Sequence, residues 1–264
     1  LVGYKSFIQE NLYNYLKQNN NIEKIKFKDL NKLKLENCQL IINFSQDQNF
    51  YSKKYLKKKD RNLYISNLIK KKKIKLILLS TRQVYLPKLN ITEKSKLKPM
   101  NIYAKNCLKS ESLCRLILKN KLLVLRLSNV IGLEIGKKKK PSLMSLFISG
   151  LKKKLIIVDN NYYLYKDLIP IELLCEYMKK LIEKDIYGVV NVGSGIPILV
   201  KSFIEHIFDL KYVKFKVIKS NLFNDQNYSF NIKKLQNITN IRVKKNKLAK
   251  YFDNLKIKVK KYND

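Results

Sequence analysis

Four residues of this chain, in two groups, have side chains or backbone suited to binding an anion or transferring a proton. Gly3 and Ser6 lie in a short turn between an apolar start and an amphipathic segment. A tight turn before a helix presents backbone N–H groups to a phosphate, and a glycine leaves room for its approach. Tyr103 and Cys107 are four residues apart, so a helix places both on one face, about one turn apart. Without a cation nearby, a phenol keeps a pKa near about 10 and is a poor base at neutral pH.

Segments typical of strands and helices alternate along the first half of the chain. Apolar runs at 1–3, 22–28, 38–44, 74–80 and 122–127 favour strands, and helical periodicity is present at 6–17, 60–72 and 101–119. This alternation indicates a doubly wound parallel sheet, which binds ligands across the carboxyl ends of its strands. We therefore predict an α/β fold of the Rossmann type.

The second half of the chain predicts a smaller lobe. Helices are expected at 141–152, 171–183, 200–208, 231–235 and 245–252, and a short strand at 155–158. We place a sheet domain at 1–135 and a C-terminal lobe at 136–264, from which the segment around 166–195 returns to the sheet domain. With 264 residues, of which 45% are hydrophobic, the chain can bury a full core.

The formal charge of +36 would suit a partner with phosphates. Almost all of the excess is lysine, in runs such as 70–73, 137–140 and 152–154, which fall at expected helix ends and loops. Such runs usually form a solvated surface, so we disfavour nucleic acid as the partner but keep it as an open alternative.

Cysteine usage and hydropathy bear on the compartment. The four cysteines have no C-x-x-C spacing and only one histidine to assist them, so we expect free thiols, no metal site and a cytoplasmic location. No apolar run is long enough for a membrane span, and the start has no charged region typical of a signal peptide, so we expect neither.

Six short runs occur in the order found in the extended short-chain dehydrogenase/reductases, the NAD-dependent epimerase/dehydratase superfamily. They lie at 3–8, 41–45, 79–85, 125–132, 166–170 and 190–195. The first resembles G-x-x-G-F-I-G, the third S-T-D-x-V-F and the fourth R-x-S-N-V-Y-G. Within the superfamily the chain is most similar to the dTDP-4-dehydrorhamnose reductases. A homodimer is a further expectation.

The resemblance implies a site for NAD or NADP within 1–135. The residues placed there are Gly3, Ser6, Phe7, Ile8, Asp29, Phe44 and Ser45. Gln9 replaces the last glycine of the motif and would crowd the approach of the helix to its strand. Lys26 and Lys28 precede Asp29; an acid at this point would hold a ribose 2′-hydroxyl and a lysine would favour a 2′-phosphate, so the choice between the two cofactors stays open.

The resemblance also implies catalytic roles. Tyr103 would exchange a proton with a sugar carbonyl that the Thr81 hydroxyl orients. Cys107 stands where the family has the lysine that lowers the pKa of the phenol. Lys105 points to another side of the helix and does not substitute for it. Asn129 and Arg82 are the candidates for contact with the substrate.

Two functions from different classes follow, and charge alone supports a third. The first is an NAD(P)-dependent reductase, epimerase or dehydratase acting on a nucleotide sugar in surface polysaccharide synthesis. The second is a protein of the same fold that binds a nucleotide or nucleotide sugar without turnover, because Cys107 carries no charge. The third is an RNA-binding member of the superfamily.

Overall fold

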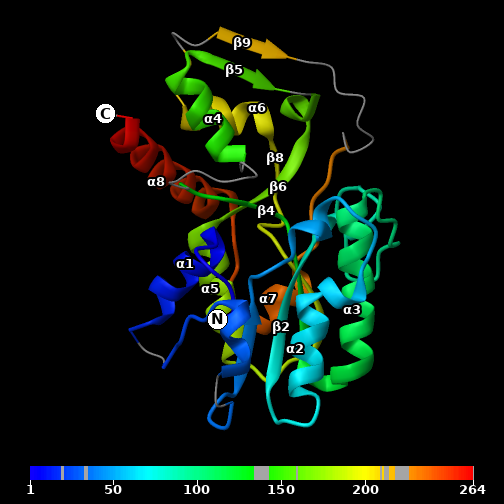
Figure 1. Cartoon of the computed structure of the whole chain (residues 1–264). Coiled ribbons are helices and arrows are strands. Elements are labelled where there is room, and N and C mark those ends of the chain that lie inside the picture. Colours follow the sequence, from blue (N-terminus) through cyan, green and yellow to red (C-terminus); the bar gives the residue numbers. More distant parts are fainter. Residues whose placement is uncertain are drawn as a thin grey trace.

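The centre of the molecule is a parallel sheet with helices on both faces (Figure 1). The computed structural model describes residues 1–18, 21–32, 35–133, 143–158, 160–208, 210, 214–217 and 226–263. Four strands are hydrogen-bonded in the order β1, β2, β3, β7, and all three pairs are parallel. Their bounds are β1 Leu40–Asn43, β2 Lys75–Thr81, β3 Leu122–Leu127 and β7 Gly188–Val192. The predicted doubly wound α/β fold is confirmed.

Two single-residue bridges extend this sheet beyond β1. Val2 forms parallel bridges with Asn43 on one side and Ile25 on the other. The chain therefore passes from Val2 outward to Ile25 and then returns to the opposite side of Val2 as β1. The prediction of a strand at 22–28 is wrong except for the bridge at Ile25. The backbone N–H of Asp29 donates to the carbonyl of Lys26, and a 3-10 helix begins at Phe27.

Helices cover both faces of the sheet. α1 (Phe7–Leu16) and α5 (Ile171–Ile182) pack together on one face, and α2 (Arg61–Ile69) and α3 (Ile102–Leu118) pack together on the other (Figure 1). Short 3-10 helices connect the main elements; they are η1 Phe27–Lys32, η2 Gln48–Tyr51, η3 Lys57–Lys59, η4 Arg82–Val84, η5 Lys119–Lys121 and η6 Asn160–Tyr163.

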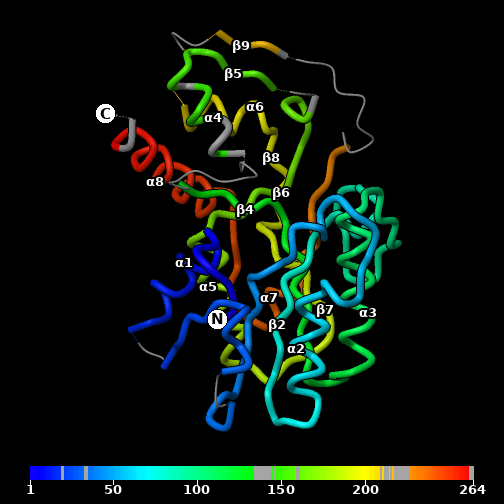
Figure 2. Tube along the Cα trace, viewed as in Figure 1, coloured from blue at the N-terminus to red at the C-terminus, as the bar shows by residue number. Residues whose placement is uncertain are grey.

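The second part of the chain builds smaller sheets above the carboxyl ends of the central strands (Figure 2). β6 (Tyr165–Pro170) pairs in parallel with β4 (Asn129–Ile131) and antiparallel with β8 (Pro197–Leu199). β5 (Leu155–Val158) pairs with β9 (Lys214–Val217). The helices of this part are α4 Leu143–Lys152, α6 Val200–Ile207, α7 Lys233–Thr239 and α8 Lys245–Asn263.

The core follows the hydrophobic pattern of the sequence. All six residues of β3 are buried, as expected for a central parallel strand covered on both faces. α8 extends eleven residues beyond the predicted end at 252, because Leu255 and Val259 continue its buried face. The predicted boundary at 135 lies outside the described residues. Within the described part of the chain, no helix is long and apolar enough to cross a membrane.

Candidate active site

The first candidate region is the point at which the strand order reverses. The chain leaves Val2 on one side and returns as β1 on the other, so the residues after Val2 and after Asn43 flank this reversal. Ligands of open α/β sheets bind in the crevice at such a point, outside the carboxyl ends of the strands. Gly3, Phe44 and Ser45 follow these strand ends directly.

A pocket of about 390 Å³ opens at this reversal. It is lined by residues that follow three neighbouring strand ends, together with the first residue of α2: Gly3, Tyr4, Lys26, Phe27, Lys28, Ser45 and Arg61. Two of the predicted site residues, Gly3 and Ser45, are therefore in the lining. The volume lies within the range of about 300–1,000 Å³ that is usual for small-molecule sites.

Gly3 and Gln9 together form the corner between the first strand and α1. Gly3 has φ +154°, and a Cβ there would come 3.1 Å from both Gln9 Oε1 and Phe44 Cβ, so only glycine fits without displacement. The Gln9 side chain is fully buried, with Nε2 3.4 Å from the Leu1 carbonyl oxygen. Its Oε1 has no hydrogen-bond partner among the residues that the structure describes. Gln9 thus fills the space between helix and strand, while the pocket lies outside that space.

The start of α1 carries three of the predicted cofactor residues, Ser6, Phe7 and Ile8. Ser6 occupies the N-cap position, but its side chain makes no capping hydrogen bond. Phe7 and Ile8 begin the helix and pack against the core from partly buried positions. The structure places Asp29 in η1, where its carboxylate lies 3.9 Å from Lys32 Nζ, and Asp29 is not among the pocket residues.

The second candidate region joins the end of β2 to the start of α3 through side-chain hydrogen bonds. Thr81 Oγ1 accepts from the backbone N–H of Gln83 at 3.2 Å, and Gln83 Oε1 accepts from Asn101 Nδ2 at 2.8 Å. Asn101 caps α3 by accepting from the N–H of Ala104. These three bonds fix the backbone that carries Thr81 relative to the helical turn that carries Tyr103.

Tyr103 lies between an aromatic ring and a thiol. The Tyr51 ring stacks on it with centroids 4.9 Å apart and 12° between the planes. The thiol of Cys107, one turn further along the same helix, is close enough to the phenol to affect its pKa. Cys107 is only 3% exposed and belongs to the hydrophobic core.

This environment keeps both groups protonated. Burial raises the pKa of the Tyr103 phenol well above its ordinary value, and neighbouring Cys107 and Tyr51 raise it further. Burial likewise raises the pKa of the Cys107 thiol to about 12. At neutral pH the site therefore holds a neutral phenol beside a neutral thiol, and the phenol can donate a proton but cannot accept one.

The predicted substrate residues Arg82 and Asn129 lie in contact with each other. Arg82 Nε donates to Asn129 Oδ1 at 3.4 Å, and the guanidinium lies 3.7 Å from the centre of the Tyr228 ring. Lys166 Nζ lies 5.5 Å from the same ring. Two cations thus flank one buried aromatic side chain beyond the carboxyl end of β2. Tyr228 follows no recognisable motif, so the sequence did not single it out.

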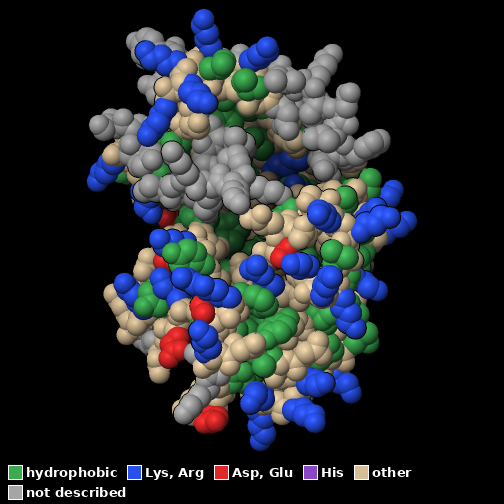
Figure 3. Space-filling view, in the orientation of Figure 1, with side chains coloured by type: hydrophobic (Ala, Val, Ile, Leu, Met, Phe, Trp, Pro, Cys, Tyr) green, Lys and Arg blue, Asp and Glu red, His purple; other side chains and the backbone are tan. Residues whose placement is uncertain are grey.

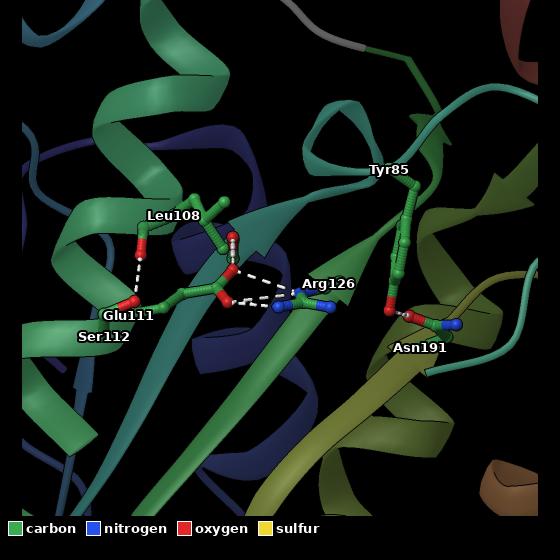
Figure 4. Close-up of polar contacts among 7 residues, drawn as sticks. Tyr85, Leu108, Glu111, Ser112, Arg126 and Asn191 are labelled. Atoms are coloured by element: carbon green, nitrogen blue, oxygen red, sulfur yellow. Dashed lines mark hydrogen bonds and ion pairs between the residues drawn. The ribbon is translucent and has the colours of Figure 1, made fainter. Parts of the chain in front are cut away.

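A buried polar network lies beneath the two regions (Figure 4). Arg126 and Glu111 form an ion pair at 2.5 Å, with side chains 4% and 1% exposed, and Ser80 donates to the same carboxylate. The Tyr85 hydroxyl donates to Asn191 Oδ1 at 2.8 Å, and the Arg126 guanidinium lies 4.8 Å from the Tyr85 ring. Arg126 is therefore an ion-paired residue of the buried interior.

The lysines and arginines form no single stripe on the face shown in Figure 3, where they are scattered among apolar and acidic side chains. Among the described residues, no group of three or more His, Cys, Asp or Glu is arranged to hold a metal ion. His206 pairs with Asp253 at 2.8 Å on the surface, away from both candidate regions.

Solved structures show where this fold occurs. The dTDP-glucose 4,6-dehydratase of Bacillus anthracis, determined with NAD, superposes with a TM-score of 0.80 at 19% identity, covering 98% of this chain and 95% of that one. A UDP-N-acetylglucosamine 4-epimerase of Methanobrevibacter ruminantium gives 0.81 at 17% identity, covering 97% and 95%. RMD of Pseudomonas aeruginosa, complexed with NADPH, gives 0.72 at 18% identity, covering 97% and 98%.

Sequence comparison gives the family. No curated protein sequence matches the chain. The profile of the NAD dependent epimerase/dehydratase family matches residues 10–193, more than half of the chain, beginning just after the turn at Gly3. The chain therefore belongs to the NAD dependent epimerase/dehydratase family.

Proposed function

We propose that this protein is an NAD(P)-dependent oxidoreductase that reduces the keto group of a nucleotide-linked sugar. The observation that carries this proposal is the Tyr103 phenol, which stays protonated at neutral pH beside the neutral Cys107 thiol and can therefore act as a proton donor. Hydride addition to a ketone produces an alkoxide, which is a stronger base than a phenolate, so a neutral phenol suffices as donor.

The residues present fit a dinucleotide. Gly3 leaves a space that a Cβ would fill, the N-terminus of α1 offers backbone donors, and the pocket beside it has the size of a nucleoside site. We assign Gly3, Ser6 and Ser45 to binding the cofactor, which when bound supplies the hydride. Phe7, Ile8 and Phe44 support the turn.

The remaining assignments concern the sugar. We propose that the Thr81 hydroxyl orients the carbonyl oxygen and that Tyr103 protonates it. Arg82 and Asn129 are then available for the polar groups of the substrate, because both are partly exposed beyond the strand ends. The resemblance of the sequence motifs to dTDP-4-dehydrorhamnose reductases supports a keto-sugar substrate and a role in surface polysaccharide synthesis.

The compartment and assembly are part of the same proposal. All four cysteines are free thiols, which supports a reducing compartment such as the cytoplasm. A homodimer is proposed on the resemblance alone, and sedimentation of the purified protein tests it.

Binding and turnover together test the function. NADH or NADPH at a hundred times its Kd stabilises the protein by about 2.7 kcal/mol and raises its Tm. With dTDP-4-keto-6-deoxyglucose as the probe substrate, absorbance of the reduced nicotinamide falls in a single turnover. Tyr103→Phe lowers that rate by about a hundredfold or more and leaves nucleotide affinity unchanged. No Tm shift with either nucleotide contradicts the proposal.

The buried thiol of Cys107 favours a second candidate, a protein that binds a nucleotide sugar without turning it over. This protein would show the Tm shift with nucleotide but no hydride transfer, with either dTDP-4-keto-6-deoxyglucose or a set of other keto-sugar nucleotides. Cys107→Lys separates the two candidates. If the variant gains turnover that Tyr103→Phe removes, the site is a degenerate catalytic one; if neither substitution has an effect, Tyr103 has no role in the chemistry.

A further inference from the structure

We propose that the pocket at the strand reversal recognises a nucleotide that carries a phosphate on the 2′-oxygen of its adenosine ribose, so that the protein uses NADPH in preference to NADH. This inference rests on the proposed function, because it concerns the cofactor of the same site. It goes beyond that function by assigning the choice between two cofactors to three side chains, Lys26, Lys28 and Arg61.

The three cations converge on one pocket from two elements. Lys26 and Lys28 follow the bridge of Ile25 in the second parallel segment, and Arg61 is the first residue of α2. All three line the 390 Å³ pocket, and Gly3 belongs to the same lining. A dinucleotide whose diphosphate lies on the turn at Gly3 extends its adenosine ribose toward the end of the second strand, where these lysines lie.

Two of the cations are held by aromatic rings rather than by carboxylates. Lys26 Nζ lies 4.7 Å from the centre of the Tyr4 ring, and the Arg61 guanidinium lies 4.9 Å from the centre of the Phe27 ring. In the described part of the chain, neither these two residues nor Lys28 forms an ion pair with an Asp or Glu. Their charges are therefore positioned without a direct ion pair, although the Asp47 carboxylate is close enough to interact electrostatically with Arg61. An arginine so placed can bind a phosphate through two N–H groups.

The acid that would bind an unmodified ribose is directed elsewhere. Asp29 is the nearest carboxylate in sequence, but it lies in η1 against Lys32 and outside the pocket lining. Among the described residues that line the pocket there is no Asp or Glu to accept from a 2′-hydroxyl. A 2′-phosphate, with a charge of about −1.5 to −2 at pH 7, finds three cations there instead.

Isothermal titration calorimetry with nucleotide fragments tests the proposal without a catalytic readout. The probes are adenosine 2′,5′-bisphosphate, adenosine 3′,5′-bisphosphate and 5′-AMP. The first is expected to bind at least about tenfold more tightly than the other two, because charge-assisted hydrogen bonds to the 2′-phosphate are formed only there. Equal affinity for the two bisphosphates indicates attraction to charge alone, as expected of a surface for RNA, and overturns the proposal.

Substitution of the cations identifies which of them recognise the phosphate. Arg61→Met and Lys28→Met are each expected to weaken 2′,5′-bisphosphate binding about tenfold or more and to leave 5′-AMP within about twofold. Lys58→Met is the matched control, because it removes the same charge from exposed η3, close to Arg61 but outside the pocket. If Lys58→Met has the same effect as Arg61→Met, the three pocket residues carry no special role.

Titration with the whole cofactors distinguishes failure of this inference from failure of the proposed function. NADPH binding more tightly than NADH supports both. NADH binding as tightly as NADPH overturns the inference and leaves the function in place. Absence of binding by either dinucleotide overturns both. Far-UV circular dichroism of each variant checks that Arg61→Met still folds, and Lys28→Met, at an exposed position, repeats the measurement outside α2.

Discussion

The rings of Tyr51 and Tyr103 stack with their centroids 4.9 Å apart and their planes inclined by 12°. Tyr51 comes from the short helix η2, whereas Tyr103 comes from the first turn of α3. Stacking withdraws one face of the Tyr103 phenol from water, and Cys107 contacts it from the helix side. Both neighbours of the Tyr103 phenol are therefore neutral, whereas a neighbouring cation would lower its pKa.

Removing the stacked ring is expected to lower the pKa of the Tyr103 phenol toward its ordinary value. In Tyr51→Ala the phenol regains contact with water, and the proximity of a second ionisable phenol is lost. The chain has 17 tyrosines, so the phenolate absorbance of Tyr51→Ala between pH 9 and 12 is compared with that of Tyr51→Ala/Tyr103→Phe. The difference isolates Tyr103. The same difference is measured between the parent protein, which keeps Tyr51, and Tyr103→Phe. If the two difference curves have the same midpoint, the Tyr51 ring does not raise the pKa of the Tyr103 phenol.

The ion pair of Glu111 with Arg126 is expected to be essential for stability. Replacing Glu111 with Gln leaves a buried guanidinium without its counter-charge, which costs about 3–5 kcal/mol of the free energy of unfolding. Urea denaturation measures the loss. Lys180→Gln, which breaks the exposed pair with Glu183, is the matched control and changes stability by about 1 kcal/mol or less. If Glu111→Gln and Lys180→Gln lower the free energy of unfolding equally, the Arg126 guanidinium is in contact with water rather than buried.

The buried thiols are expected to make the fold sensitive to alkaline pH. Burial raises the pKa of Cys107, Cys114 and Cys175 from 9.0 to about 12. The folded state therefore retains protons that the unfolded chain releases, so stability is full below pH 9 and falls as pH rises toward 12. Each thiol contributes up to about 1.4 kcal/mol per pH unit in that window.

Cys114→Ala tests this assignment. The decrease in unfolding free energy between pH 8 and pH 10 should be about 1 kcal/mol smaller in the variant than in the parent protein, whatever the cost of the substitution at pH 8. An identical decrease would mean that the thiol ionises as readily in the folded state as in the unfolded one.

Gly193 is expected to tolerate no side chain. A Cβ at this position would lie 2.6 Å from Oδ2 of Asp167, a fully buried carboxylate that accepts from the backbone N–H of Ser194, Gly195 and Phe230. Gly193→Ala should therefore destabilise the protein by about 1–3 kcal/mol in thermal or urea unfolding. Ser194→Ala removes the hydroxyl that donates to Asp167 and accepts from the N–H of Ile196, and should cost about 1 kcal/mol. A larger loss than in Gly193→Ala contradicts the steric explanation.

The sequence predicted most of the central sheet because its strands are continuous apolar runs and its helices are amphipathic. β2, β3 and α3 lie within a residue or so of their predicted bounds. The segment at 22–28 was mistaken for a full strand, because its alternation is compatible with an edge position that forms only one bridge. Periodicity also stopped α8 too early, at Phe252, although its buried face continues.

The sequence was less informative about the surroundings of the candidate site. Tyr51 and Tyr228 belong to no motif, and their contacts with Tyr103 and Arg82 join segments that are far apart in the chain. The pocket cations were visible in the sequence at Lys26 and Lys28, but Arg61 lies more than thirty residues later. Only the packing of α2 against the strand ends brings Arg61 to the same pocket.

The hydrogen bonds from Thr81 through Gln83 to Asn101 involve none of the atoms assigned to proton transfer. Backbone placement at the strand end and helix start is therefore independent of what stands at positions 103 and 107. During evolution, position 107 can therefore change from lysine to cysteine, or position 103 from tyrosine to phenylalanine, without loss of the fold that binds the nucleotide. Loss of chemistry and loss of structure are separable events in such a protein.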